Sequence, residues 1–121
     1  MSNTVLVVED EVDLLFTIAL SLELNGYRVV KAASGEEAVA LVERERPDAV
    51  VLDIRLPGMD GWDVLNRLHE MGHFPVTPVE LLSAQVDAAT ASRAVELGCH
   101  AHLAKPFSIT ELSGVLRELL A

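Results

Sequence analysis

The sequence predicts an α/β fold: one open, doubly wound parallel sheet of five strands with helices on both faces. Short β-branched apolar runs alternate with longer segments of helical spacing, and the runs lack polar alternation, as in strands that are covered on both faces. Strands alternating with helices imply right-handed crossovers between parallel strands. The length of 121 residues suits a single domain, so we expect one (βα)5 domain over residues 1–121.

The expected strands are the apolar runs Thr4–Val8, Arg28–Ala32, Ala49–Leu52, Val79–Leu82 and Ala101–Ala104. Only the fourth run contains an acidic residue, Glu80, which lies in its interior. A buried carboxylate without a partner is costly. We therefore expect Glu80 near the start of its strand, partly solvated and with a structural rather than a catalytic role.

The expected helices are Val12–Leu24, Gly35–Glu45, about Trp62–Met71, about Asp87–Leu97, and a last one that follows Ser108 and continues to Leu120. Ser34 with Glu37, and Ser108 with Glu111, have the spacing of a capping box. A glycine follows the first, third and fourth helices closely, and Pro47 ends the second.

Composition excludes several classes of function. The chain has 19 acidic residues against 9 Lys and Arg, and its net charge of −10 argues against direct contact with nucleic acid. No apolar run approaches the ~20 residues of a membrane span, and no signal-like segment begins the chain. The single Cys99 excludes an internal disulfide framework. We expect a soluble, cytoplasmic domain without membrane contact.

Polar residues follow four of the five expected strands. Glu9 and Asp10 follow the first, Asp53 the third and Ser83 the fourth, and the fifth leads to Lys105. Each has an ordinary alternative; Asp10, for example, is a suitable cap for the first helix. Because ligands of open α/β sheets bind beyond the carboxyl ends of the strands, we expect these side chains to converge there.

This set of residues indicates phosphoryl chemistry. Carboxylates at close range repel each other, and Mg²⁺ relieves the repulsion because it binds one or two carboxylates, keeps waters and accepts phosphate oxygens. No glycine-rich loop follows the first strand, so we expect a small phosphoryl group rather than a nucleotide. Aspartate is a known nucleophile for such a group, and a lysine and a hydroxyl neutralise and position it.

Four segments resemble the receiver domain of two-component response regulators, the CheY-like family, and the resemblance covers the whole chain. They are Val5–Glu11, Val50–Gly61, Leu82–Ala84 and Lys105–Phe107, of which the second and fourth are the most specific. The resemblance implies a flavodoxin-like strand order of 2-1-3-4-5. It also implies a signalling phospho-acceptor that catalyses only its own phosphorylation and dephosphorylation.

The resemblance implies roles for the residues that handle phosphate. Asp53 accepts the phosphoryl group from a phosphohistidine, and Ser83 and Lys105 contact its oxygens. The bond from Lys105 to Pro106 is expected to be cis. Ser83 and His102, which stands where an aromatic residue is usual, are the expected switch residues. We expect His102 to fill that aromatic position rather than to sense pH.

The resemblance also implies a metal and partners. Asp10, Asp53 and the backbone carbonyl of Arg55 would bind Mg²⁺, with Glu9 bound directly or through water. A sensor histidine kinase or a histidine phosphotransfer protein would supply the phosphoryl group. The surface of the fourth helix, fifth strand and fifth helix would contact an effector domain or protein, and homodimerisation on phosphorylation is left open. The phosphate lifetime depends in this family partly on Arg55 and Gln85.

Two other functions fit parts of the pattern. A haloacid-dehalogenase-like phosphohydrolase also uses a strand-end Asp and Mg²⁺, but it needs a second Asp where this chain has Arg55. An interaction module that has lost phosphorylation would not be expected to keep Asp53 and Lys105. The sequence names neither the kinase nor the stimulus. Nor does it decide between a stand-alone regulator and part of a longer protein.

One motif match is set aside. His69-Glu70-Met71-Gly72-His73 fits the H-E-x-x-H zinc pattern, which needs both histidines on one face of a continuous helix. Gly72 lies inside the match and Phe74-Pro75 follow at once. We therefore expect no zinc site there. His100 is expected in a loop.

Overall fold

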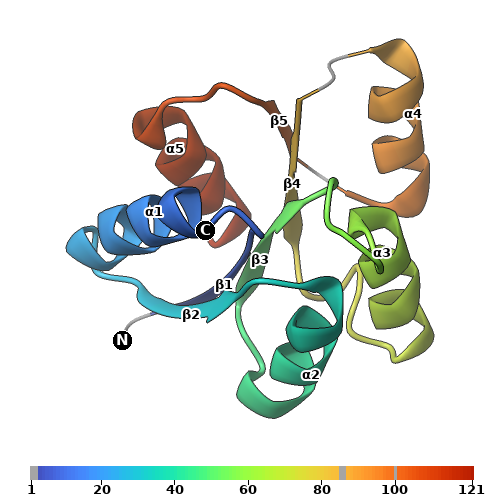
Figure 1. The fold of residues 1–121 in the computed structure, drawn as a ribbon, viewed down its shortest axis with the longest axis horizontal. Coiled ribbons are helices and arrows are strands. Elements are labelled where there is room, and N and C mark those ends of the chain that lie inside the picture. The colour runs from blue at the N-terminus through green and yellow to red at the C-terminus, as the bar shows by residue number, and fades with distance from the viewer. Residues whose placement is uncertain (1–2, 85–86, 100) are drawn as a thin grey trace.

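The computed structural model describes residues 3–84, 87–99 and 101–121, in which five strands alternate with five helices (Figure 1). They are β1 Thr4–Val8, α1 Val12–Leu24, β2 Arg28–Ala32, α2 Gly35–Glu45, β3 Ala49–Asp53, α3 Gly61–Glu70, β4 Val79–Ser83, α4 Ala88–Leu97, β5 Ala101–Ala104 and α5 Ile109–Leu119. Gln85 and His100, which the sequence analysis mentions, lie outside the described residues. No helix in the described ranges is long and apolar enough to cross a membrane.

All strand pairs are parallel, and the strands lie in the order β2-β1-β3-β4-β5. Asp53 pairs with Leu82, and Ser83 pairs with Ala104. The carboxyl ends of β3, β4 and β5 therefore lie side by side at one edge of the sheet. The fold class and strand order are confirmed.

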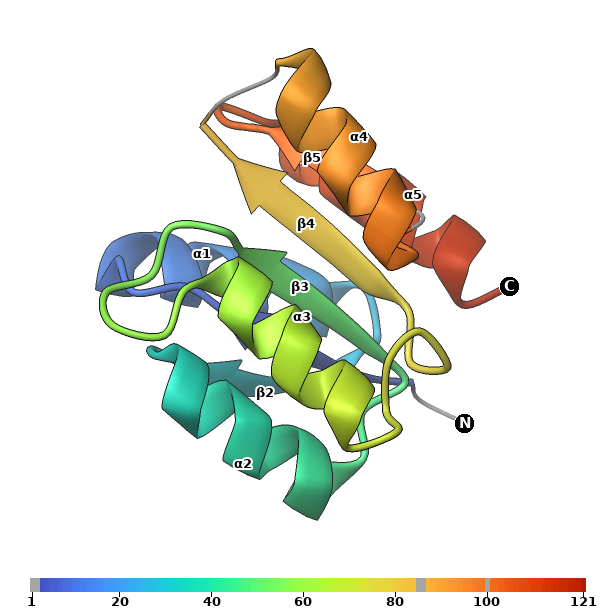
Figure 2. The ribbon, with the colours of Figure 1, turned by 90° about the vertical axis from the view of Figure 1, so that its right-hand side faces the viewer.

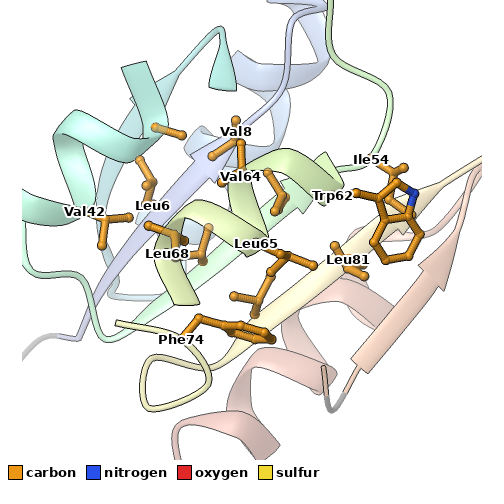
Figure 3. Packing of buried hydrophobic residues seen from close by; sticks show 14 of the residues in the cluster. Leu6, Val8, Val42, Ile54, Trp62, Val64, Leu65, Leu68, Phe74 and Leu81 are labelled. Carbon is orange, nitrogen blue, oxygen red and sulfur yellow. The ribbon is translucent and has the colours of Figure 1, made fainter. Parts of the chain in front are cut away.

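Helices cover both faces of the sheet: α1 and α5 lie on one side, and α2, α3 and α4 on the other (Figures 1 and 2). Alternate residues of one strand enter different cores, since Val7 packs with α1 and α5 while Leu6 packs with α2 and α3. Figure 3 shows Leu65 and Leu68 of α3 within the second of these clusters. Burial on both faces explains why the strands lack polar alternation.

The helix ends explain which polar side chains remain available. Ser108 and Glu111 form the expected capping box of α5, with both hydrogen bonds at 3.1 Å. Ser34 accepts the expected hydrogen bond from the α2 backbone. The N-cap of α1 is Glu11, without a side-chain cap. Asp10 is therefore not used as a helix cap.

The H-E-x-x-H match does not form a zinc site. Helix α3 ends at Glu70, and Gly72 has a left-handed φ of 82°. The ring of His73 is hydrogen-bonded to the Glu43 carboxylate on α2, with Nε2 2.6 Å from Oε2. The two histidines thus do not share one helix face.

Glu80 is buried, contrary to the sequence prediction. Its side chain is 0% exposed, and neither carboxylate oxygen has a hydrogen-bond partner among the described residues. The reason is that strand pairing begins before Glu80, since the Pro78 carbonyl accepts a hydrogen bond from the Val50 N–H. Glu80 itself pairs with Val51 on β3 and with Ala101 on β5, so it lies inside the sheet. Burial raises the pKa of Glu80 to about 8.

We expect Glu80 to make the fold less stable as pH rises. The carboxyl has a pKa of 4.5 in the unfolded chain and about 8 in the folded one. The stability that depends on a neutral Glu80 is therefore complete below pH 4.5 and is lost as pH rises through about 8. Replacement by Leu should increase the free energy of unfolding at pH 8 by about 1–3 kcal/mol and by less at pH 5. Urea unfolding of both proteins measures this difference.

Glu80→Gln is the matched control, because it removes the ionisation but keeps a polar side chain. Its unfolding free energy should vary less with pH than that of the wild type. A stability difference between wild type and Glu80→Leu that is independent of pH would contradict the assignment of a raised pKa.

Candidate functional site

The acidic cluster forms where the chain leaves the sheet. Asp53 is the last residue of β3, and Glu9 directly follows β1. The backbone N–H of Glu9 donates to Ala32 O at 3.1 Å, and that of Lys105 donates to Ser83 O at 2.8 Å. Strand pairing therefore continues into the residues that carry the functional side chains. Glu9 and Asp53 are both buried.

Lys105 joins the two buried carboxylates. Its Nζ lies 3.0 Å from Oε2 of Glu9 and 3.1 Å from Oδ2 of Asp53. The other oxygen of Asp53 accepts the Arg55 backbone N–H at 3.2 Å, and that of Glu9 accepts the Glu11 N–H at 3.4 Å. Each carboxylate thus binds one ammonium and one loop amide, which fixes its orientation.

The site has more negative charge than Lys105 neutralises. Burial, with a smaller contribution from the neighbouring Asp53 and against the opposing effect of Lys105, raises the pKa of Glu9 to about 7. Burial lowers the pKa of Lys105, but hydrogen bonds and charge from Glu9 and Asp53 outweigh it, so the net pKa is raised. The lysine is therefore held in its charged form.

Glu9, Asp10 and Asp53 together offer a set of oxygen ligands. One carboxylate oxygen from each lies within 4.8 Å of the others, and Asp10 is exposed to solvent. An all-carboxylate set suits a hard divalent cation, which would also offset the excess charge. The residues present therefore fit Mg²⁺. The backbone carbonyl of Arg55 belongs to the loop that already bonds Asp53.

The loop after β3 is packed closely against Asp53. A Cβ atom on Gly61 would lie 2.7 Å from the Asp53 carbonyl oxygen, so only glycine fits there. Helix α3 then begins with a capping box between Asp60 and Asp63, which the sequence analysis did not anticipate although an acid three residues after another is its signal.

A hollow of about 490 Å³ lies beside Asp10 and this loop. It is lined by Asp10, Ile54, Arg55, Leu56, Pro57, Asp60 and Trp62. The Arg93 guanidinium of α4 lies 4.3 Å from the centroid of the Trp62 ring, a cation–π contact that joins α4 to α3. Sequence reasoning did not find the contact between Trp62 and Arg93, because nothing local links the two positions.

Ser83 and His102 occupy neighbouring strands. Ser83 is buried at the end of β4, between the strands that lead to Asp53 and Lys105. His102 is half-buried in β5 and pairs with Leu81, and its Nε2 atom is buried without a hydrogen-bond partner among the described residues. The Lys105–Pro106 bond is cis, as expected. The structure thus brings Glu9, Asp10, Asp53 and Lys105 together, with Ser83 adjacent.

Comparison with known proteins matches residues 5–117 to the model of the response regulator receiver domain. The chain is 40% identical over 117 residues to the probable transcriptional regulatory protein TcrX of Mycobacterium tuberculosis, covering 97% of this chain and 49% of that protein. It is 34% identical over 120 residues to the alkaline phosphatase synthesis transcriptional regulatory protein PhoP of Bacillus subtilis, covering 99% and 49%. The chain therefore spans about half the length of these curated relatives.

Among solved structures, the chain is similar to the receiver domain of the sensor histidine kinase PA1611 from Pseudomonas aeruginosa. The TM-score is 0.88 at 31% identity, and the match covers 99% of this chain and 98% of that one. That structure has a magnesium ion coordinated in its active-site cleft.

We expect Lys105→Ala to destabilise the fold, because it leaves two buried carboxylates facing each other without a cation. The loss should be roughly 1–3 kcal/mol in urea unfolding at neutral pH. Lys31→Ala is the control, since Lys31 is exposed and lies outside the cluster. Equal stability of the two variants would show that Lys105 does not offset the repulsion.

Proposed function

Because the chain belongs to the response regulator receiver family, we propose that Asp53 accepts a phosphoryl group from a phosphohistidine in a Mg²⁺-dependent reaction. The observation that carries this proposal is the position of Lys105. Its Nζ lies 3.1 Å from the carboxylate of Asp53, which belongs to the acidic cluster with Glu9 and Asp10. The chain is a receiver of two-component signalling, a signalling module rather than a metabolic enzyme. We further propose residues 1–121 as one receiver domain.

Each residue of the cluster has a distinct task in this reaction. An oxygen of Asp53 forms a bond to phosphorus as the phosphorus–nitrogen bond of the donor breaks and the donor imidazole leaves. Lys105 already contacts Asp53, so its ammonium can form an ion pair with an oxygen of the transferred phosphoryl group. The Ser83 hydroxyl donates a hydrogen bond to a second phosphoryl oxygen. Mg²⁺, held by Asp10, Asp53 and the Arg55 carbonyl with Glu9 direct or through water, would neutralise the transferred oxygens.

Switching would follow from the new charge on Asp53. Ser83 moves toward the phosphoryl group, and His102 on the neighbouring strand responds to that movement. Helix α4 packs lightly against the sheet, since Ala94 is its only buried residue in the described range. We propose that the α4, β5 and α5 surface carries the change to an effector, and that a sensor histidine kinase or a histidine phosphotransfer protein is the donor.

The curated relatives support a role in controlling an output. Two of them are named as transcriptional regulators and are about twice as long as the region that matches this chain. We propose that this receiver likewise regulates an output domain or protein in the cytoplasm, without contacting nucleic acid itself. No observation favours the phosphohydrolase, because Arg55 occupies the place of its second Asp and its side chain is exposed.

Treatment with acetyl phosphate and Mg²⁺ should add the mass of one phosphoryl group to the wild type and none to Asp53→Asn. Intact-mass spectrometry measures the change. Asp48→Asn is the control, because Asp48 directly precedes β3, at the opposite end of the strand from Asp53. Equal phosphorylation of wild type and Asp53→Asn would overturn the proposal. So would a wild type that takes up no phosphoryl group.

Asp10→Asn should weaken Mg²⁺ binding at least about tenfold, since one of the carboxylates of the cluster becomes neutral. Isothermal titration calorimetry with MgCl₂ measures the dissociation constant. Asp13→Asn, also exposed but outside the cluster, should bind Mg²⁺ like the wild type. A similar loss in both variants would indicate that only net charge matters, and that these carboxylates do not form a defined site.

A further inference from the structure

Helix α1 exposes a row of large apolar side chains that the proposed function does not use. Val12, Phe16, Leu20 and Leu24 are 58%, 55%, 59% and 80% exposed. They are four of the six large hydrophobic residues that are exposed in the described part of the chain. Their spacing of four residues places them along one ridge of the helix, the kind that packs into a groove of another helix. We call these four residues the α1 row.

No residue of the α1 row lines the hollow that other α1 residues form with Lys105. Lys31 of the edge strand β2 places its ammonium 4.4 Å from the centroid of the Phe16 ring, so this side of α1 borders β2. The other side of α1, with Leu14 and Thr17, lines a separate hollow together with Lys105. A protein that docks beside the site for phosphotransfer would therefore leave much of the α1 row uncovered.

The polar residues of α1 that lie beside the α1 row can be buried in a contact that excludes water. Thr17, Ser21 and Asn25 each donate a side-chain hydrogen bond to the carbonyl four residues earlier, at 2.8, 2.8 and 2.9 Å. These polar groups already have partners within the helix. A second helix can cover these residues without leaving those side-chain donors unsatisfied.

We propose that the α1 row binds the α1 row of a second copy of this chain, with the two helices antiparallel. A two-fold axis at the level of Ile18 places Phe16 opposite Leu20 of the second copy, and Val12 opposite Leu24. The same patch then serves on both sides of the contact, as an isologous dimer requires.

The charges beside the row are complementary in this arrangement. Glu23 lies seven residues from Phe16 and hence on nearly the same line of the helix, and Lys31 lies over Phe16. Neither forms an ion pair among the described residues, although Lys105 and several arginines and glutamates do. The two-fold axis brings Lys31 of one copy to within about one helical turn of Glu23 of the other, twice per dimer.

The dimer should be weak and independent of phosphorylation. One helix ridge from each copy forms a contact of the small class that buries less than ~1,200 Å² in total. We therefore expect a reversible dimer with a dissociation constant between about 10 µM and about 1 mM. Because Asp53 takes no part in the contact, Asp53→Asn should dimerise like the wild type. Failure of the phosphorylation proposal would therefore not affect this result.

Sedimentation equilibrium over a wide concentration range tests the contact. The wild type should shift from the 13.1 kDa monomer to twice that mass as concentration rises. Leu20→Asp should raise the dissociation constant at least about tenfold. Val95→Asp is the matched control, because Val95 is 72% exposed on α4, and it should leave the constant unchanged. Circular dichroism checks that the variants are folded.

A charge exchange tests the proposed arrangement. Glu23→Lys and Lys31→Glu should each weaken the dimer about threefold, and the double variant should recover wild-type affinity. A wild type that stays monomeric at about 1 mM would overturn the proposal. A dimer that Leu20→Asp leaves intact, that Val95→Asp disrupts or that needs phosphorylated Asp53 would overturn it too, as would a double variant weaker than either single one.

Discussion

The ammonium of Lys105 between two buried carboxylates is the interaction on which the rest of the site depends. It lies 3.0 Å from Glu9 and 3.1 Å from Asp53, and without it their repulsion would oppose the folded arrangement. With the exposed Asp10, the site still has more carboxylates than cations. This shortage of positive charge would favour a divalent ion in the proposed Mg²⁺ site, while the lysine stays next to the oxygen that would attack phosphorus.

The parallel sheet makes this arrangement possible. Residues 9, 53 and 105 are far apart in sequence, but each lies where a strand ends, and parallel pairing brings these ends to one edge. The supporting loops are equally specific. Gly61 permits the chain to pass against the Asp53 carbonyl, and the Arg55 amide holds one Asp53 oxygen. One backbone amide and the Lys105 ammonium therefore orient the Asp53 carboxylate.

Much of this structure followed from local patterns in the sequence. Apolar runs and caps predicted the elements, and strand-end positions predicted that Asp10, Asp53 and Lys105 converge. Contacts between distant side chains could not be predicted in this way, among them the bridge from Lys105 to both Glu9 and Asp53, and Arg93 on Trp62. Glu80 was expected to be partly solvated, but hydrogen bonding at Pro78 extends the sheet ladder beyond it. The exposure of the α1 row depends on which face of α1 packs on the sheet.

A crystal structure of the chain with Mg²⁺ and beryllofluoride would test the central claim most directly. The fluoride complex mimics a phosphoryl group on the nucleophile. Our account predicts the complex on Asp53, with an ion about 2.0–2.1 Å from oxygens of Asp10 and Asp53. It also predicts that the Lys105 ammonium turns from the Asp53 carboxylate to a fluorine. Beryllofluoride bound elsewhere, or a Lys105 that contacts neither Asp53 nor the fluoride complex, would contradict the account.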